Sequence, residues 1–201
     1  MTNRGNLGTA SRRNLLVATL GIGLTPTRYI MAAEPAITSY GTKSTQAPSQ
    51  LDLFSFLAGK WKGIGTTKLP DGGTAKFQVI WIGRYILNGM AIADEFHSLT
   101  PEGSPYLGIS LRSFDRQHDC WIIEYLNVSN SFIRRQVNPE SGSVRRDDNT
   151  VVVISEDGQI KIRENYRIEN HSRFTYSTDA SHDGGRNWDA VSIEISLERV
   201  E

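Results

Sequence analysis

The sequence has a single cysteine, Cys120, among 201 residues. An intramolecular disulfide is therefore excluded, and packing and hydrogen bonds alone must hold the fold together. Cys120 precedes Trp121 in an apolar run, which is typical of a packed side chain rather than of a reactive thiol. The Gly-x-Ser-x-Gly motif of serine hydrolases is also missing.

Histidine is scarce, and no two histidines have the short spacing of a metal site. The sequence therefore predicts no metal and no bound cofactor. The four histidines are His97, His118, His171 and His182.

The chain carries no net charge, since it has 22 basic and 22 acidic residues. The first 33 residues, however, contain four arginines and no acidic residue, which leaves 18 basic and 22 acidic residues, a net charge of −4, for the rest. A mildly acidic domain lacks the basic surface that binds nucleic acid or anionic lipid. Partners of both kinds are disfavoured on this ground.

Long hydrophobic runs are missing too. The longest apolar stretch, residues 15–24, has about ten residues, too few to span a bilayer core of about 30 Å. It follows Arg12-Arg13, and this pair resembles the bacterial twin-arginine signal, with small residues at 31–33 where a peptidase could cut. We expect residues 1–33 to be a signal peptide without a membrane span, and the mature protein to be periplasmic or secreted.

Composition divides the remainder into two parts. Residues 34–50 are rich in Ser, Thr, Pro and Gln, which predicts a flexible spacer. Residues 51–201 form the folded domain. It opens with Leu51, Leu53, Phe54 and Leu57, whose crowding predicts one or two helical turns that cover a barrel end.

Strand patterns then alternate with turn residues, as in an all-β domain. Short connections between successive strands favour an antiparallel up-and-down β-barrel of about nine or ten strands over a β-sandwich. The expected strands are 60–69, 74–83, 86–98, 106–114, 120–128, 132–137, 151–155, 160–168, 173–178 and 188–200.

The opening of this domain, residues 56–63, reads Phe-Leu-Ala-Gly-Lys-Trp-Lys-Gly and resembles that of lipocalin-like (calycin) proteins. Phe114-Asp115 followed by Trp121, and Asp183-Gly184-Gly185 followed by Trp188, are similar to a bacterial lipocalin-like family of unknown function. The resemblance covers roughly residues 51–200 and implies the fold more than an activity. Nitrobindins share the opening and bind haem through a late histidine, but no histidine follows Trp188 here.

Several predicted strands place a charge on an otherwise apolar face. Glu164, Glu124 and Asp94 each alternate with large apolar residues, so each must be paired, hydrated or protonated if it points inward. Outward-facing or ion-paired carboxylates are the alternative. The candidate ligand-binding residues are Trp81, Asp94, Arg112, Glu124, Arg134, Glu164 and Tyr166, with Glu124 and Glu164 also candidate catalytic acid/base residues.

The first functional hypothesis is an exported barrel that binds a small, partly apolar molecule. The second is an enzyme of the same fold, an isomerase, cyclase, hydratase or lyase that uses buried carboxylates. The third is an interaction protein with a filled barrel. The sequence leaves the oligomeric state open, a dimer included.

Overall fold

The computed structural model describes residues 41–69, 71–99, 103–129, 131–189 and 193–200, with only the backbone of Phe132 and Asp157. The expected signal peptide and the first part of the expected spacer lie outside these residues. No helix in the described part of the chain is long and apolar enough to cross a bilayer.

The first regular element of the described chain is a 3-10 helix, η1 (Ser49–Leu57), and 11 strands follow it. The first six are β1 (Gly59–Lys68), β2 (Thr74–Ile86), β3 (Ala91–Leu99), β4 (Pro105–Asp115), β5 (Cys120–Asn127) and β6 (Phe132–Val137). The last five are β7 (Ser143–Asp147), β8 (Thr150–Asp157), β9 (Ile160–Asn170), β10 (Arg173–Ser181) and β11 (Ile193–Arg199).

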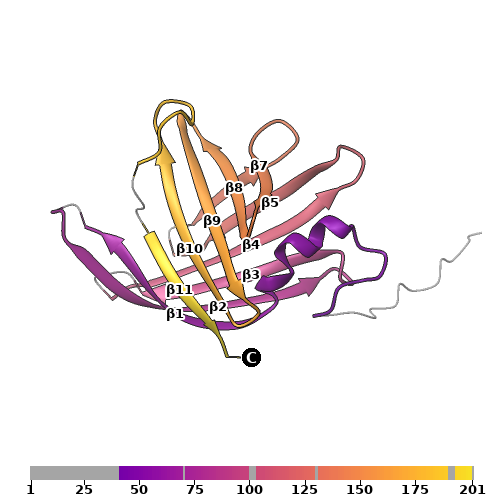
Figure 1. Ribbon diagram of the computed structural model, residues 1–201, viewed down its shortest axis with the longest axis horizontal. Coiled ribbons are helices and arrows are strands. Elements are labelled where there is room, and N and C mark those ends of the chain that lie inside the picture. The colour runs from indigo at the N-terminus through magenta and orange to yellow at the C-terminus, as the bar shows by residue number, and fades with distance from the viewer. Residues whose placement is uncertain (1–40, 70, 100–102, 130, 190–192, 201) are drawn as a thin grey trace, which may run out of the picture. The chain divides into compact units, whose positions relative to one another are not determined.

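All strands belong to one antiparallel sheet that curls into a nearly closed barrel. Its order is β6-β5-β4-β3-β2-β1-β11-β10-β9-β8-β7, so each strand pairs with its neighbour in sequence except at the break between β6 and β7. The first and last strands pair directly, with Gly63 opposite Leu197, and Figure 1 shows them side by side. The predicted up-and-down barrel is confirmed, with a seam where the ladder of the described strands ends at β6 and β7.

The strand count is slightly higher than predicted, because β7 has no counterpart in the sequence-based assignment. This edge strand has one apolar residue, Val144, among charged and polar ones, so it shows no alternation. A second difference concerns the strand expected to start at Ile86. Leu87 and Asn88 have positive φ angles of 51° and 56° and form a turn with Gly89, so β3 starts only at Ala91.

Helix η1 covers one end of the barrel, as the sequence predicts. Its Leu51, Phe54 and Leu57 are fully buried, and Figure 1 shows the coil lying against the sheet. A Cβ atom at Gly83 of β2 would lie 2.1 Å from the carbonyl oxygen of Leu57. Only glycine allows the two backbones to approach this closely, and this contact fixes the helix on the barrel.

The spacer expected over residues 34–50 ends earlier than predicted. Its described part is hydrogen-bonded to the barrel, with Gly41 N donating to Tyr85 O at 2.9 Å and Ser44 N donating to Gly89 O at 3.1 Å. Ser49 and Gln50 already belong to η1. Polar composition misled the prediction, because the backbone of these residues makes the contacts.

Candidate functional site

The barrel encloses a cavity of about 500 Å³. It extends from a polar network in the middle of the barrel toward the end opposite η1, where Leu99 of the wall is 55% exposed. Most of its surface is aromatic or aliphatic. The aromatic and aliphatic wall residues are Phe77, Trp81, Phe96, Leu99, Tyr106, Tyr125, Ile162, Tyr166, Tyr176, Ala180, Ile193 and Ile195; the polar ones are Thr67, Asp94, Ser98, Ser110, Arg134, Gln136, Glu164, Thr178 and Asp179.

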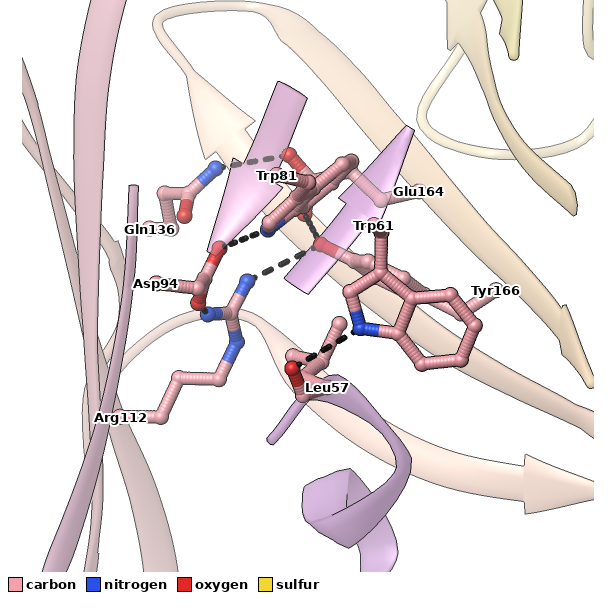
Figure 2. Close-up of polar contacts among 8 residues, drawn as sticks. All are labelled: Leu57, Trp61, Trp81, Asp94, Arg112, Gln136, Glu164 and Tyr166. Carbon is pink, nitrogen blue, oxygen red and sulfur yellow. Dashed lines mark hydrogen bonds and ion pairs between the residues drawn. The ribbon is translucent and has the colours of Figure 1, made fainter. Parts of the chain in front are cut away.

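A buried ion pair forms one side of the inner end. Arg112 of β4 and Asp94 of β3 pair through Nη1 and Oδ2, and both side chains are 1% exposed. Trp81 Nε1 donates to the other carboxylate oxygen of Asp94 at 2.7 Å (Figure 2). Asp94 is thus held by two partners, and its charge is neutralised in place.

The same arginine leads to a second carboxylate. Arg112 Nη2 donates to the hydroxyl of Tyr166 at 3.1 Å, and that hydroxyl donates to Glu164 Oε2 at 3.2 Å. Gln136 Nε2 donates to the other oxygen, Glu164 Oε1, at 2.9 Å. Figure 2 shows these groups pointing toward one another from strands that are distant in sequence.

Helix η1 packs against this network through Phe54. The Arg112 guanidinium lies 5.0 Å from the ring centroid of Phe54, and the Phe54 ring packs edge-on against Tyr166 at 6.1 Å. Trp61 Nε1 donates to the Leu57 carbonyl at 3.1 Å, which anchors the end of the helix (Figure 2). The inner end of the cavity is therefore closed by packed aromatic rings.

Three tyrosines of the wall have a pKa above the ordinary value of tyrosine. Burial raises the pKa of Tyr166, and the nearby Glu164 carboxylate adds to this effect. Burial and the same carboxylate raise the pKa of Tyr176 well above its ordinary value. Burial and a hydrogen bond to Tyr106 likewise raise the pKa of Tyr125. These hydroxyls act as neutral hydrogen-bonding groups near neutral pH.

A third carboxylate of the cavity wall also forms an ion pair. Asp179 of β10 forms an ion pair of 2.6 Å with Arg163 of β9, and Asn165 Nδ2 donates to it at 3.1 Å. The Arg163 guanidinium stacks on the Trp188 ring at 4.3 Å. The contacts of Arg163 and Asn165 hold Asp179 in the wall.

The structure brings six of the seven candidate residues together. Trp81, Asp94, Arg134, Glu164 and Tyr166 line the cavity, and Arg112 lies buried directly behind them, bound to Asp94 and Tyr166.

Glu124 is the exception, because it lies on the outer face of β5. Its side chain is 39% exposed and forms an ion pair of 2.7 Å with Arg135. Both faces of β5 carry apolar residues, and the inward face is that of Trp121, Ile123 and Tyr125. Glu124 is therefore not placed to act on a molecule in the cavity.

Sequence reasoning missed Gln136 and most of the aromatic wall. Gln136 is 3% exposed and follows Arg134 and Arg135, which gave β6 no clear inward face. Tyr125 could have been found from its alternation with Trp121 and Ile123. For Gln136 there was no sequence signal.

The described residues offer little to a metal or a haem. Among them, no group of three or more His, Cys, Asp or Glu side chains is placed to hold a metal ion. No histidine belongs to the described cavity wall, so these residues do not fit a haem bound through histidine.

No family model matches this chain, and no curated protein matches it in sequence. Solved structures do match. Rv2717c from M. tuberculosis is 13% identical with a TM-score of 0.54, over 77% of this chain and 99% of its own. The S-type phycobiliprotein lyase CPES from Guillardia theta is 8% identical with a TM-score of 0.50, over 77% and 94% of the two chains. These neighbours are lipocalin-like barrels, so the predicted resemblance holds for the fold.

Proposed function

We propose that this chain binds a small, partly apolar molecule inside its barrel. The observation that carries the proposal is the cavity of about 500 Å³, whose walls are mostly aromatic or aliphatic and whose inner end presents Glu164, Gln136 and Tyr166. Ligand sites in proteins are typically about 300–1,000 Å³, apolar, with a few polar groups that orient the ligand. A cavity of this size argues against the filled barrel of an interaction protein.

The support comes from this chain's own residues. The phycobiliprotein lyase is only 8% identical to this chain, so the likeness supports the fold and carries no argument about individual residues. The buried network of Arg112, Asp94 and Tyr166 fixes the inner end of the cavity before any ligand arrives. Preorganisation of this kind reduces the entropy lost on binding.

Native mass spectrometry of the protein purified from its own source tests this proposal. We expect the intact protein to carry an additional small mass that disappears under denaturing conditions. If the native and the denatured protein both show only the mass of the polypeptide, the proposal is contradicted.

One observation favours a second function, that of an enzyme. Glu164 lines the cavity and lies within hydrogen-bond reach of a protonated Tyr166, so a carboxylate and a hydroxyl face one space. Glu164 would act as the acid/base of an isomerase, cyclase, hydratase or lyase. Turnover and substrate binding of the Glu164→Gln variant test this second function. We expect turnover to be lost while substrate binding is unchanged, and turnover equal to that of the wild type contradicts it.

We also propose that the chain is exported through the twin-arginine pathway to the periplasm or beyond. The support is the Arg12-Arg13 pair with its short apolar stretch and the small residues Ala32 and Ala33. Replacing both arginines with lysine should retain the full-length precursor in the cytoplasm. Undiminished export of that variant contradicts the proposal.

A further inference from the structure

Glu164 is a buried carboxylate in the cavity wall, and it is only 8% exposed. It accepts hydrogen bonds from Gln136 and Tyr166, and among the described residues we find no ion pair to it. A carboxylate is rarely buried to this degree unless a cation or several donors compensate it. Two neutral donors leave further acceptor capacity on its oxygens.

The other charged groups of the described wall do not change this picture. Asp94 is neutralised by Arg112, and Asp179 by Arg163. Arg134 also lines the cavity, but it precedes Gln136 by two residues on β6 and so lies one side-chain position nearer the open end. Glu164 is thus the carboxylate at the inner end for which the described residues provide no ion pair, whereas Asp94 there is paired with Arg112.

A neutral amide accompanies this carboxylate. Gln136 Nε2 donates to Glu164 Oε1 at 2.9 Å, whereas Gln136 Oε1 is covered and presents no acceptor surface to the cavity. Gln136 therefore holds Glu164 in place, and Glu164 is the acceptor that a ligand reaches.

The walls around Glu164 are aromatic. The Tyr176 ring lies 5.2 Å from that of Trp81 and 5.0 Å from that of Tyr166, measured between centroids. Aromatic rings attract cations through their electron-rich faces. A cation at Glu164 gains from the carboxylate, whereas an anion there is repelled by it.

We infer that the ligand carries a protonated nitrogen, as an ammonium group or a protonated heterocycle, which binds to Glu164 at the inner end of the cavity. This inference rests on the proposed function, because it names the chemical class of the molecule that the cavity binds. The apolar part of the ligand then lies against the aromatic walls, toward the open end.

Three fluorescent probes with one common dansyl group test the inference. Dansyl amide is neutral, dansyl-ethylenediamine carries an ammonium group, and dansyl-glycine carries a carboxylate. We expect the ammonium probe to bind about tenfold more tightly than the neutral probe, as a charge-assisted hydrogen bond predicts. The anionic probe should bind most weakly.

Two variants with the same substitution assign the preference to one residue. Glu164→Gln keeps an acceptor for Tyr166 but removes the charge, so the preference for the ammonium probe should disappear while dansyl amide still binds. Glu124→Gln makes the same change on the outer face and should leave all three affinities unchanged. If Glu164→Gln does not fold, Gln136→Met should weaken the ammonium probe selectively.

The possible results separate the two proposals. Equal binding of the neutral and ammonium probes, or a preference that survives Glu164→Gln, overturns the inference but leaves a binding barrel. Preference for dansyl-glycine overturns it and directs attention to Arg134. If none of the three probes binds, the proposed function itself is contradicted.

Discussion

Gln136 of β6 donates a hydrogen bond of 2.9 Å to Glu164 of β9, across the seam where the ladder of the described strands ends at β6 and β7. This contact joins the two sides of the barrel through side chains, in the place where the other strands use their backbones. It also lies in the cavity wall. The same pair thus bridges the two sides of the seam and forms part of the candidate site.

Removing this bond should destabilise the protein. Gln136→Met keeps the volume of the side chain but removes the donor, so Glu164 loses one of its two partners. We expect the free energy of unfolding to fall by about 1–3 kcal/mol, measured by urea denaturation. Gln78→Met, at an exposed position of β2, should change it by less than about 0.5 kcal/mol. Equal effects of the two changes contradict the role of the seam contact.

The Arg112–Asp94 pair should matter far more than an exposed pair of the same kind. Arg112→Met leaves Asp94 buried without its cation, and we expect a loss of about 3–5 kcal/mol. Arg135→Met removes the partner of the half-exposed Glu124 and should cost about 0–1 kcal/mol. Thermal and urea denaturation of both variants measure the difference. Similar losses would falsify the account of the buried network.

The wall tyrosines predict how stability changes in alkali. In the unfolded chain Tyr176 ionises near its ordinary pKa of 10.0, whereas burial raises its pKa in the folded protein. Above pH 10.0 the folded state therefore holds more protons than the unfolded state. The contribution of the protonated Tyr176 to the free energy of unfolding is complete below pH 10.0 and is lost as the pH rises toward the pKa of the folded state. Tyr176→Phe should show a shallower alkaline loss of stability, followed by urea denaturation at a series of pH values. Parallel curves for the two proteins contradict this expectation.

The fold followed from alternation and turn residues, because a curled sheet with a covered interior imposes a period of two on most strands. Ser192–Glu198 shows how clear this can be, since Ile193, Ile195 and Leu197 alternate with polar residues. The edge strand β7 was missed for the opposite reason. Its single apolar residue, Val144, leaves no period to detect.

The candidate site was harder to predict, because apolar alternation does not say which face points inward. On β4, Leu107, Ile109 and Leu111 form the more apolar face, yet Leu111 is 43% exposed while Arg112 on the opposite face is buried. The same ambiguity on β5 made Glu124 a candidate for the cavity in the prediction. A cavity with a polar inner end places charged residues on the inward face, against the usual rule that the more apolar face points inward. Only the three-dimensional arrangement therefore decides which face of a strand points inward.

The most direct test of the account is whether the cavity is where a molecule binds. Thr67 of β1 lines the cavity, and its neighbour Thr66 points to the other face of the strand. N-phenyl-1-naphthylamine, a neutral apolar probe whose fluorescence rises on burial, can be titrated into the wild-type protein, Thr67→Trp and Thr66→Trp. The account predicts saturable binding to the wild type and to Thr66→Trp, weakened about tenfold or more in Thr67→Trp. No saturable binding to the wild type, or equal affinities for all three proteins, would contradict it.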